Sequence, residues 1–269
     1  MKEKFNRAKK STYGQNFIYN QALLADLTAE CKLQSTDTVL EIGAGAGTLT
    51  EVLAQTVKHV TSVEIDESLL PYLNVLQEKY TNLNIILADF MQWDFESVFA
   101  NTKNLKVIAN IPYYITTAIY HKLLFCNLDI AEISCMVQLE VAQKIVATPK
   151  QKNEYGTLAL LCQHKYHTEI IQVIGKENFS PVPKVDSAFV RLVKKENFIE
   201  NTTFDNFYYK LVKAAFLHRR KTLLNSLKSS GYNINEVSLA LQNIADIQAR
   251  AENLSYTQYI ALAKALIKH

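Results

Sequence analysis

One segment of the chain is more informative than any other: Val39-Leu-Glu-Ile-Gly-Ala-Gly-Ala-Gly-Thr-Leu-Thr50. Its apolar start predicts a buried strand, which is followed by a turn with glycine at every second position and then by a helix. Glycine has no side chain to obstruct a bound molecule, and the first turn of a helix offers unpaired N–H groups. The segment therefore predicts a strand–turn–helix unit whose turn binds a ligand.

The same alternation of strand and helix continues along the first two thirds of the chain. Apolar runs of strand length lie at Thr38–Ile42, Val60–Ile65, Asn84–Leu87, Lys106–Ala109 and Ile133–Leu139, and helical spacing occurs near Leu49–Val57, Leu69–Lys79 and Thr117–Phe125. Strands buried on both faces and separated by helices indicate a parallel sheet with helical crossovers. Further along, Glu169–Ile174 and Val185–Val193 predict an antiparallel pair at an edge.

The pattern changes towards the C-terminus. Lys194–Thr203 is mostly polar and without periodicity, as in a linker, and from Phe204 onward apolar residues recur only at helical spacing. With 269 residues, the chain is long for one domain and short for two large ones. We therefore predict a main α/β domain with a basic N-terminal segment, residues 1–195, and a small all-helical domain, residues 204–269.

Two acidic side chains stand where the next two strands are predicted to end. Glu64 closes the second strand, 19 residues after Gly45, and a carboxylate there can accept both ribose hydroxyls of an adenosine. Asp89 closes the third strand, where a side chain can meet an adenine amine. Together with Gly43 and Gly47, these residues predict a cofactor that contains adenosine, rather than a plain glycine-rich turn.

The glycine spacing separates two kinds of cofactor. A dinucleotide-binding turn reads Gly-x-Gly-x-x-Gly, because the third glycine lets the helix pack beside a pyrophosphate. Here Thr48 stands at that third position, and the spacing is Gly43-x-Gly45-x-Gly47. This spacing favours S-adenosylmethionine, which carries no phosphate and whose methionine end lies over the turn. We therefore predict a Rossmann-like class I methyltransferase fold that uses S-adenosylmethionine.

The tetrapeptide Asn110-Ile-Pro-Tyr113 follows the fourth strand, at the edge of the sheet where a cofactor would lie, so Asn110 is also a candidate cofactor-binding residue. The side-chain oxygen of Asn110 and the carbonyl oxygen of Ile111 can each accept a hydrogen bond from one NH2 group. Holding both hydrogens turns the lone pair of the nitrogen towards an electrophile. Pro112 fixes the backbone, and Tyr113 offers an aromatic face to a base, a contact worth roughly 1–3 kcal/mol. The motif predicts methylation of the N6 amine of adenine in RNA; a proline-terminated strand with a packing tyrosine is the alternative.

Positive charge is concentrated in two segments, although the net charge is only +3. The balance is +4 over residues 1–10 and +6 over residues 210–228. Such clusters can neutralise phosphates, and a solvated tail and a basic helix face explain the same charges equally well. A helix over residues 216–227 would place its leucines on one face and its cations on the other. The candidate RNA-binding residues are Lys9, Lys10, Arg219, Arg220 and Lys221.

Composition and spacing exclude several other classes of protein. The chain is 48% hydrophobic and 20% charged, as expected for a globular protein, and it has no apolar run long enough to span a bilayer. The basic N-terminus lacks an apolar segment behind it, so we expect no secretory signal and a cytoplasmic location. The four cysteines are scattered and predict reduced thiols. His164 and His167 lack a third ligand nearby, so no metal is expected.

Several motifs together resemble the KsgA-type family of ribosomal RNA adenine N6,N6-dimethyltransferases, which also includes the erythromycin-resistance and mitochondrial transcription-factor-B-like branches. The resemblance spans nearly the whole chain. It rests on Lys10–Phe17, the glycine turn, Val63–Asp66, Asp89, Asn110–Thr116, Val137–Ala142, Phe179–Ala188 and Phe216–Asn225. It implies a mostly parallel seven-stranded sheet.

The resemblance also implies roles that the residues alone do not suggest. The segment Gln15–Ile18 would close over the cofactor, with Asn16 and Ile18 in contact with it; the family often has leucine where Ile18 stands. Phe179 would be a second aromatic ring beside the target adenine, whereas the residues alone suggest a loop phenylalanine packed under prolines. The implied substrate is a pair of adjacent adenosines in a hairpin loop near the 3′ end of 16S ribosomal RNA, each dimethylated in the precursor of the small subunit by a monomeric enzyme.

Three other functions remain open at this point. One is a resistance-type enzyme that acts on large-subunit ribosomal RNA; the basic stretch at 216–227 favours the small-subunit enzymes. A second is an RNA-binding assembly factor without catalysis, against which Asn110–Tyr113 and Glu64 argue. A third is a DNA adenine methyltransferase, a class that more often carries Asp where Asn110 stands.

Overall fold

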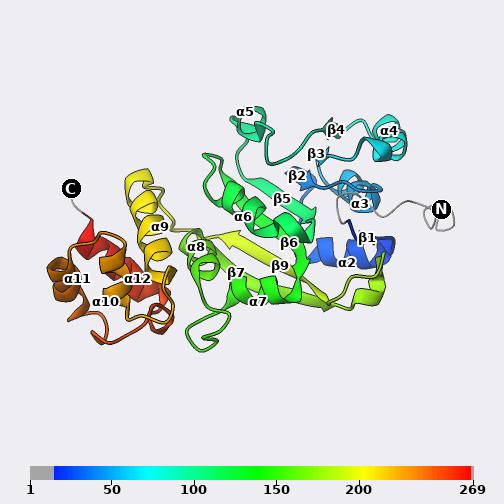
Figure 1. Cartoon of the computed structure of the whole chain (residues 1–269). Helices are drawn as coiled ribbons and strands as arrows, with labels where there is room; N and C mark the ends of the chain where they lie inside the picture. Colours follow the sequence, from blue (N-terminus) through cyan, green and yellow to red (C-terminus); the bar gives the residue numbers. More distant parts are fainter. Residues whose placement is uncertain (1–14, 268–269) are drawn as a thin grey trace. The chain divides into compact units, whose positions relative to one another are not determined.

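The computed structural model describes residues 15–267 (Figure 1). Its chain groups into two compact units. The first consists of the chain up to Ala142 together with Glu169–Lys194, and the second consists of Gln143–Thr168 together with the chain from Lys195 onward. Among the described residues, no helix has the length and apolar character needed to cross a membrane.

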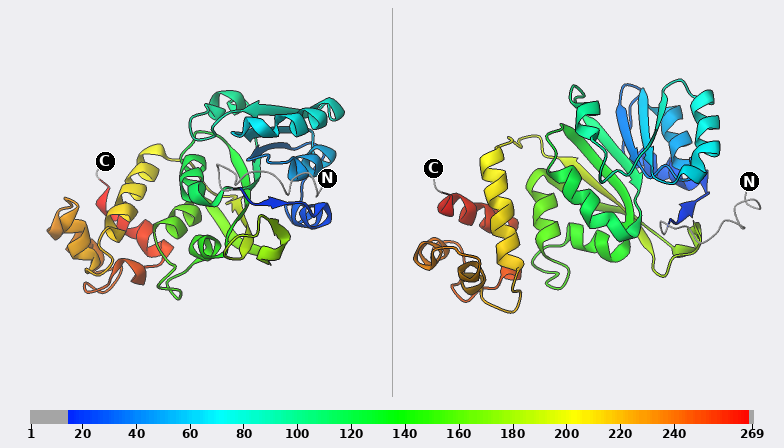
Figure 2. Two further views of the ribbon diagram at one scale, coloured as in Figure 1. Left: turned by 45° about the vertical axis from the view of Figure 1, so that its right-hand side comes forward. Right: turned by 45° about the horizontal axis from the view of Figure 1, so that its top comes forward.

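The first unit is built on a seven-stranded sheet with the strand order β4-β3-β2-β5-β6-β9-β7. The strands are β2 (Thr38–Ile42), β3 (His59–Glu64), β4 (Leu83–Leu87), β5 (Leu105–Asn110), β6 (Ile130–Gln138), β7 (Tyr166–Ile174) and β9 (Ser187–Lys194). The five strands from β4 to β6 pair in parallel, and β9 pairs antiparallel to β6. The predicted seven-stranded, mostly parallel sheet is therefore confirmed, and Figure 2 shows it from two further directions.

The hydrophobic pattern explains why the central strands lie where they do. In β2, every residue after Thr38 is buried, and in β5 Val107, Ile108 and Ala109 are almost completely inaccessible. Strands with two buried faces need covering layers, which the crossover helices supply. Leu53 of one such helix is fully buried in the same hydrophobic cluster as Val39 and Ile108.

The helices of the first unit and its boundary region include three that the sequence predicts and others that it does not. The predicted ones are α3 (Thr48–Thr56), α4 (Leu70–Lys79) and α6 (Thr116–Leu124). The others are α2 (Gln21–Glu30), α5 (Phe95–Phe99) and α7 (Leu139–Val146), with 3-10 turns η1 (Glu67–Leu69), η2 (Tyr113–Ile115) and η3 (Lys176–Asn178). A separate two-stranded sheet pairs β1 (Phe17–Ile18) with β8 (Phe179–Ser180) in antiparallel register.

The second unit is helical apart from residues 166–168, where β7 begins. Its helices are α8 (Thr157–Lys165), α9 (Thr202–Phe216), α10 (Leu223–Ser229), α11 (Ile234–Leu241) and α12 (Tyr256–Leu266), with a 3-10 turn η4 (Ala251–Asn253). From residue 204 to the last described residue the chain contains helices and no strand, as predicted.

The division of the chain differs from the predicted boundary between residues 195 and 204. Residues 143–168 group with the C-terminal helices and not with the sheet. Two contacts show why: the Tyr208 hydroxyl donates to the Leu160 carbonyl at 3.3 Å, and the Tyr155 ring meets Phe216 edge-on. The buried residues of α8 are not confined to one face of the helix. Its sequence therefore did not indicate which neighbouring elements it packs on.

The predicted helix over residues 216–227 is wrong. Helix α9 ends at Phe216, and α10 begins only at Leu223. Thr222 is the N-cap of α10, because its side chain accepts a hydrogen bond from the Asn225 N–H, and such caps favour a new helix start. The Leu223 N–H donates to the Ala249 carbonyl at 2.8 Å instead of continuing α9. The basic residues 219–221 therefore lie in a turn between two helices.

Candidate active site

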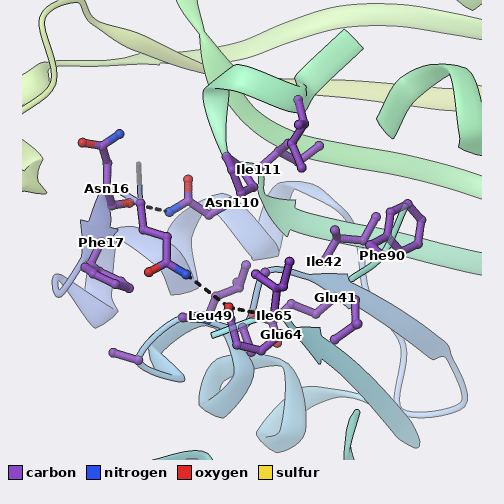
Figure 3. Close-up of a pocket in the computed structure, with 18 of the residues that line it drawn as sticks. Asn16, Phe17, Glu41, Ile42, Leu49, Glu64, Ile65, Phe90, Asn110 and Ile111 are labelled. Atoms are coloured by element: carbon purple, nitrogen blue, oxygen red, sulfur yellow. Dashed lines mark hydrogen bonds between the residues drawn. The ribbon is translucent and has the colours of Figure 1, made fainter. Parts of the chain in front are cut away.

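A cleft opens at the carboxyl ends of β2, β3 and β5 (Figure 3). The space within it, including the part that is open to solvent, amounts to about 940 Å3. The predicted residues that line it are Asn16, Ile18, Gly43, Gly45, Glu64, Asp89, Asn110, Ile111, Pro112 and Tyr113. The parallel sheet brings most of these residues together because the carboxyl ends of its strands share one edge, whereas Asn16 and Ile18 come from the segment around β1.

The glycine turn is shaped by close packing at two of its positions. Gly45 has a φ of +59°, and a Cβ there would lie 3.1 Å from the Phe17 ring. Gly47 has a φ of +83°, and a Cβ there would overlap the Leu76 side chain of α4. Both conformations are left-handed, which favours glycine. Gly47 does not line the cleft, so its lack of a side chain serves the packing of α3 against α4.

Glu64, the last residue of β3, has a carboxylate that four donors already surround. Its Oε2 accepts from the Gly45 N–H at 2.8 Å, and its Oε1 accepts from the N–H groups of Ile65 and Asp66, both at 2.9 Å. The side-chain amide of Gln15 also donates to Oε1, at 3.1 Å. Burial raises the pKa of Glu64, and the three backbone donors oppose that shift. Three of the four donors belong to the backbone, and Oε2 accepts only one of the four bonds, so a ligand hydroxyl can donate to Oε2.

Asp89 lies two residues beyond the end of β4, at the start of a tight turn. Its Oδ1 accepts from the Met91 N–H at 2.8 Å, and its Oδ2 accepts from the Gln92 side chain at 2.9 Å. The Gln92 N–H donates to the Asp89 carbonyl at 2.9 Å. These bonds hold the carboxylate on the wall of the cleft, where the sequence predicts an adenine amine.

Asn110, the last residue of β5, has a side-chain amide of defined orientation. Its Nδ2 donates to the backbone carbonyl of Asn16 at 2.9 Å (Figure 3). The amide oxygen is therefore directed away from that bond and can act as an acceptor. A Cβ on Gly43 would lie only 3.6 Å from the Asn110 carbonyl oxygen, so the glycine turn and this motif are direct neighbours.

Tyr113 begins the 3-10 turn η2 and is half-buried in the wall of the cleft. Its hydroxyl lies 2.5 Å from Ser187 Oγ, at the start of β9. Burial raises the pKa of Tyr113, and the bond to Ser187 opposes that shift. Ser187 is completely buried, and sequence reasoning did not predict it, because only the pairing of β9 with β6 brings it here.

Glu41 is a second residue that sequence reasoning missed. It lies within β2, is fully buried and lines the cleft. Its Oε2 accepts from Thr50 Oγ1 at 2.7 Å and from Ser62 Oγ at 2.5 Å, whereas its Oε1 has no hydrogen-bond partner within residues 15–267. Burial raises the pKa of Glu41 to about 7. An acidic residue inside an otherwise apolar strand was the available signal.

Phe179 is not among the residues that line the cleft. It belongs to β8, is opposite Ile18 in the two-stranded sheet, and is only 3% exposed. Its ring is part of the hydrophobic cluster that also contains Ile18. A base can therefore not stack on Phe179 in this conformation.

The candidate RNA-binding residues of the second unit differ in their surroundings. Arg219 donates to three backbone carbonyls, those of Lys152 at 2.7 Å, Tyr155 at 3.2 Å and Asn153 at 3.4 Å. Lys221 donates to Ser229 Oγ at 3.2 Å. All three cations, including Arg220, are exposed. Lys9 and Lys10 lie outside the described residues.

His164, one of the two histidines considered as metal ligands, has other contacts. His164 Nε2 lies 2.8 Å from Asp205 Oδ1, and its ring stacks on Tyr208. Burial lowers the pKa of His164, and Asp205 opposes that shift. Within residues 15–267, no group of three or more potential ligands could hold a metal ion.

Comparison with known proteins gives consistent matches over the whole chain. A family model described as "Ribosomal RNA adenine dimethylase" matches residues 6–268. A protein of Clostridium botulinum named ribosomal RNA small subunit methyltransferase A is 35% identical over 264 residues, which cover 98% of this chain and 94% of that protein.

Two solved structures have the same fold. The 23S ribosomal RNA methyltransferase ErmE has a TM-score of 0.72 at 27% identity and covers 93% of this chain and 99% of its own. A dimethyladenosine transferase from Plasmodium falciparum has a TM-score of 0.77 at 25% identity and covers 91% of this chain and 95% of its own.

Proposed function

The chain belongs to the ribosomal RNA adenine dimethylase family, and on that premise we propose that it uses S-adenosylmethionine to dimethylate the N6 amines of two adjacent adenosines in 16S ribosomal RNA. The target is a hairpin loop near the 3′ end of that RNA. The protein acts as a cytoplasmic monomer on the precursor of the small ribosomal subunit. Bases in a loop suit this chemistry, because a paired N6 amine is not accessible.

The hydrogen-bond acceptors of the cleft fit S-adenosylmethionine. Carboxylates stand at the ends of neighbouring parallel strands, with Glu64 placed for the ribose and Asp89 for the adenine. The glycine turn leaves room for the methionine end, and Asn16 and Ile18 line the same cleft. When bound, S-adenosylmethionine supplies a methyl group that is already activated towards a nucleophile.

The orientation of the Asn110 amide is the observation on which the proposed reaction depends. Because its Nδ2 is engaged by the Asn16 carbonyl, its oxygen is the atom available to an amine. The backbone carbonyl of Ile111 is a second acceptor one residue further along, and Pro112 restricts the backbone there. Two acceptors that hold both hydrogens of an NH2 group would leave the nitrogen lone pair free to face a methyl donor. The glycine turn is next to this motif, because a Cβ on Gly43 would lie 3.6 Å from the backbone carbonyl oxygen of Asn110.

The remaining groups position the target base and do not need to remove a proton before transfer. Tyr113 offers its ring as a stacking surface, and the bond to Ser187 holds that ring in place. The proton lost from the methylated amine can pass to solvent at the open side of the cleft. Catalysis then depends mainly on the alignment of the reacting atoms.

The small subunit is favoured over the large subunit as the substrate. The relative that is 35% identical over nearly the full chain is named for small-subunit RNA, whereas the large-subunit enzyme ErmE is 27% identical. We assign RNA binding to the helical part of the chain, residues 204–269, because exposed cations cluster in the turn between α9 and α10.

The experiment incubates the purified chain with radiolabelled S-adenosylmethionine and with either immature small subunits or large subunits, followed by mass mapping of modified nucleotides. We expect two adjacent N6,N6-dimethyladenosines in 16S RNA. The Asn110→Ala variant should bind the cofactor within a few-fold of wild type and transfer no detectable methyl group. Label only in large-subunit RNA would establish the resistance-type function. If neither wild type nor variant transfers a detectable methyl group while both still bind RNA, the chain is an RNA-binding assembly factor.

A further inference from the structure

Lys122 on α6 reaches across to the loop that follows β4. Its Nζ donates to three backbone carbonyl oxygens of that loop, those of Phe90 at 2.7 Å, Met91 at 3.0 Å and Trp93 at 2.8 Å. A lysine ammonium has three N–H donors and no acceptor. Each of its donors is therefore matched by one carbonyl, and the loop curls around a single cation.

Aromatic rings and carboxylates complete the surroundings of this ammonium group. Nζ lies 5.1 Å from the centre of the Phe90 ring and 5.3 Å from that of Phe95, both within the range of cation–π attraction. Asp89, Asp94 and Glu96 contribute negative charge nearby. Burial lowers the pKa of Lys122, and these three carboxylates oppose that shift.

The loop held by Lys122 forms part of the cleft wall. Asp89 and Phe90 both line the cleft, and the Trp93 N–H donates back to the Asp89 carbonyl at 2.8 Å, which closes the turn. Three carbonyl oxygens that converge on one point would repel each other without a cation between them. The position of the Asp89 carboxylate therefore depends on a side chain that does not itself line the cleft.

We propose that Lys122 is a positioning residue for the adenine end of the cofactor. By neutralising the three carbonyl dipoles, it holds Asp89 and the Phe90 ring in the arrangement that receives an adenine. This inference rests on the proposed use of S-adenosylmethionine. Adenine recognition then depends indirectly on Lys122, a cation on the helix that follows the Asn110–Tyr113 motif.

The test compares Lys122→Met, which keeps an unbranched side chain of nearly the same length and removes its charge, with the matched control Lys106→Met. Lys106 is also a half-buried lysine of the first unit, it is paired with Asp37 at 2.8 Å, and it does not line the cleft. Calorimetry measures the Kd of S-adenosylmethionine and of adenosine alone. Hydrogen exchange of the ligand-free protein reports on residues 89–95.

We expect Lys122→Met to raise both Kd values by the same factor, on the order of 10-fold, as for the loss of a hydrogen bond to a charged group, with kcat at saturating cofactor changed less than threefold. Exchange should rise in the 89–95 loop and nowhere else in the first unit. Lys106→Met should leave both Kd values unchanged even if it lowers Tm.

A second variant keeps the inference testable if Lys122→Met does not fold. Lys122→Arg retains the charge, but a planar guanidinium cannot direct its donors at the same three carbonyls. It should raise the Kd of adenosine by about threefold, consistent with the loss of part of one charged hydrogen bond. If the folded variants bind adenosine as tightly as wild type, whatever their Tm, Lys122 has only a structural role and the inference is overturned. If the wild-type chain binds neither S-adenosylmethionine nor adenosine, the proposed function is overturned as well.

Discussion

Tyr113 combines a ring that lines the cleft with a hydroxyl that is tied to Ser187 Oγ at 2.5 Å. Removal of the ring in Tyr113→Ala should lower kcat on the order of 10- to 100-fold, because base stacking is worth roughly 1–3 kcal/mol. Tyr113→Phe and Ser187→Ala should each lower kcat by about 3- to 10-fold, as expected for one hydrogen bond. Steady-state kinetics with saturating cofactor measures all three.

The double variant Tyr113→Phe with Ser187→Ala separates positioning from other effects. If the hydroxyl pair acts only by holding the ring, the double variant should be no slower than either single variant. Additive losses would mean that Ser187 acts independently of Tyr113. An unchanged rate for Tyr113→Ala would exclude the stacking role of the ring.

Glu41 links the pH to the stability of the first unit. Burial raises the pKa of Glu41 from an ordinary value of 4.5 to about 7, so the folded protein retains a proton that the unfolded chain loses earlier. The contribution of protonated Glu41 to the free energy of unfolding is fully present below pH 4.5 and is lost as the pH rises to about 7. A shift of this size corresponds to roughly 3 kcal/mol at most.

The isosteric variant Glu41→Gln should remove this dependence. We expect the free energy of unfolding of wild type to decline between about pH 5 and pH 8 relative to that of the variant, so that the variant gains most at the upper end. Urea unfolding at several pH values across this range measures the difference. Parallel pH profiles would show that Glu41 has an ordinary pKa in the folded state.

At the scale of single elements, the packing of α3 against α4 depends on Gly47. A methyl group there would overlap Leu76 and lie 3.3 Å from Leu73, in addition to the strain of a left-handed φ. Gly231 is a matched control, because its φ of +88° is equally left-handed and no described residue lies within 4 Å of the place that a Cβ would take. The two glycines therefore differ in whether a side chain has room.

Gly231→Ala should lower the free energy of unfolding by about 1 kcal/mol, from backbone strain alone. Gly47→Ala should lower it by a further 1–3 kcal/mol or so, from overpacking against α4. Urea unfolding of each variant measures both. If both variants lower the free energy of unfolding by the same amount, α4 moves aside and the close approach to Leu76 does not contribute to the loss.

The elements that the sequence predicted share a strong pattern. The strand Thr38–Ile42 matches β2, and the predicted helix Leu69–Lys79 differs from α4 by one residue, since buried strands and their crossover helices differ clearly in apolar periodicity. Helix α8 and the two-residue strands β1 and β8 were missed. Helix α8 is apolar on most sides, and a strand pair of two residues exists only through its partner.

The break between α9 and α10 shows a different limit of sequence reasoning. The leucines of residues 216–227 fit one helix, but the Thr222 cap and the bond from the Leu223 N–H to the Ala249 carbonyl favour two. The cap could have been recognised from Thr222 alone. The second bond joins two residues that are far apart in the chain, and no local pattern contains it.

At the scale of the whole molecule, most of the cleft could be predicted from the sequence, because its residues lie at the ends of predicted strands. Glu64 and Asn110 end two parallel strands of one sheet and Asp89 follows a third, so their convergence follows from topology. The groups that orient them come from elsewhere in the chain. The carbonyl of Asn16 and the ammonium of Lys122 reach the site only after folding, and neither contact has a sequence pattern.

RNA binding by the full chain provides the last prediction, because the cations of the turn after α9 are not equivalent. Arg219 donates to three carbonyls of residues 152–155, whereas Arg220 has no hydrogen-bond or ion-pair partner within the described part of the chain. Arg220→Ala should therefore weaken RNA binding and reduce the slope of log K against log salt concentration by about 1, as for the loss of one phosphate contact.

Arg219→Ala serves as the comparison and should act through folding. Loss of its three hydrogen bonds should lower the Tm of the helical unit and leave the salt slope close to that of wild type. Filter binding at roughly 50–200 mM salt, the range over which counterion release is resolved, and thermal unfolding measure the two effects separately. If the slope falls for Arg219→Ala and not for Arg220→Ala, the RNA follows the side of the turn that faces residues 152–155, and the assignment of the two arginines has to be exchanged.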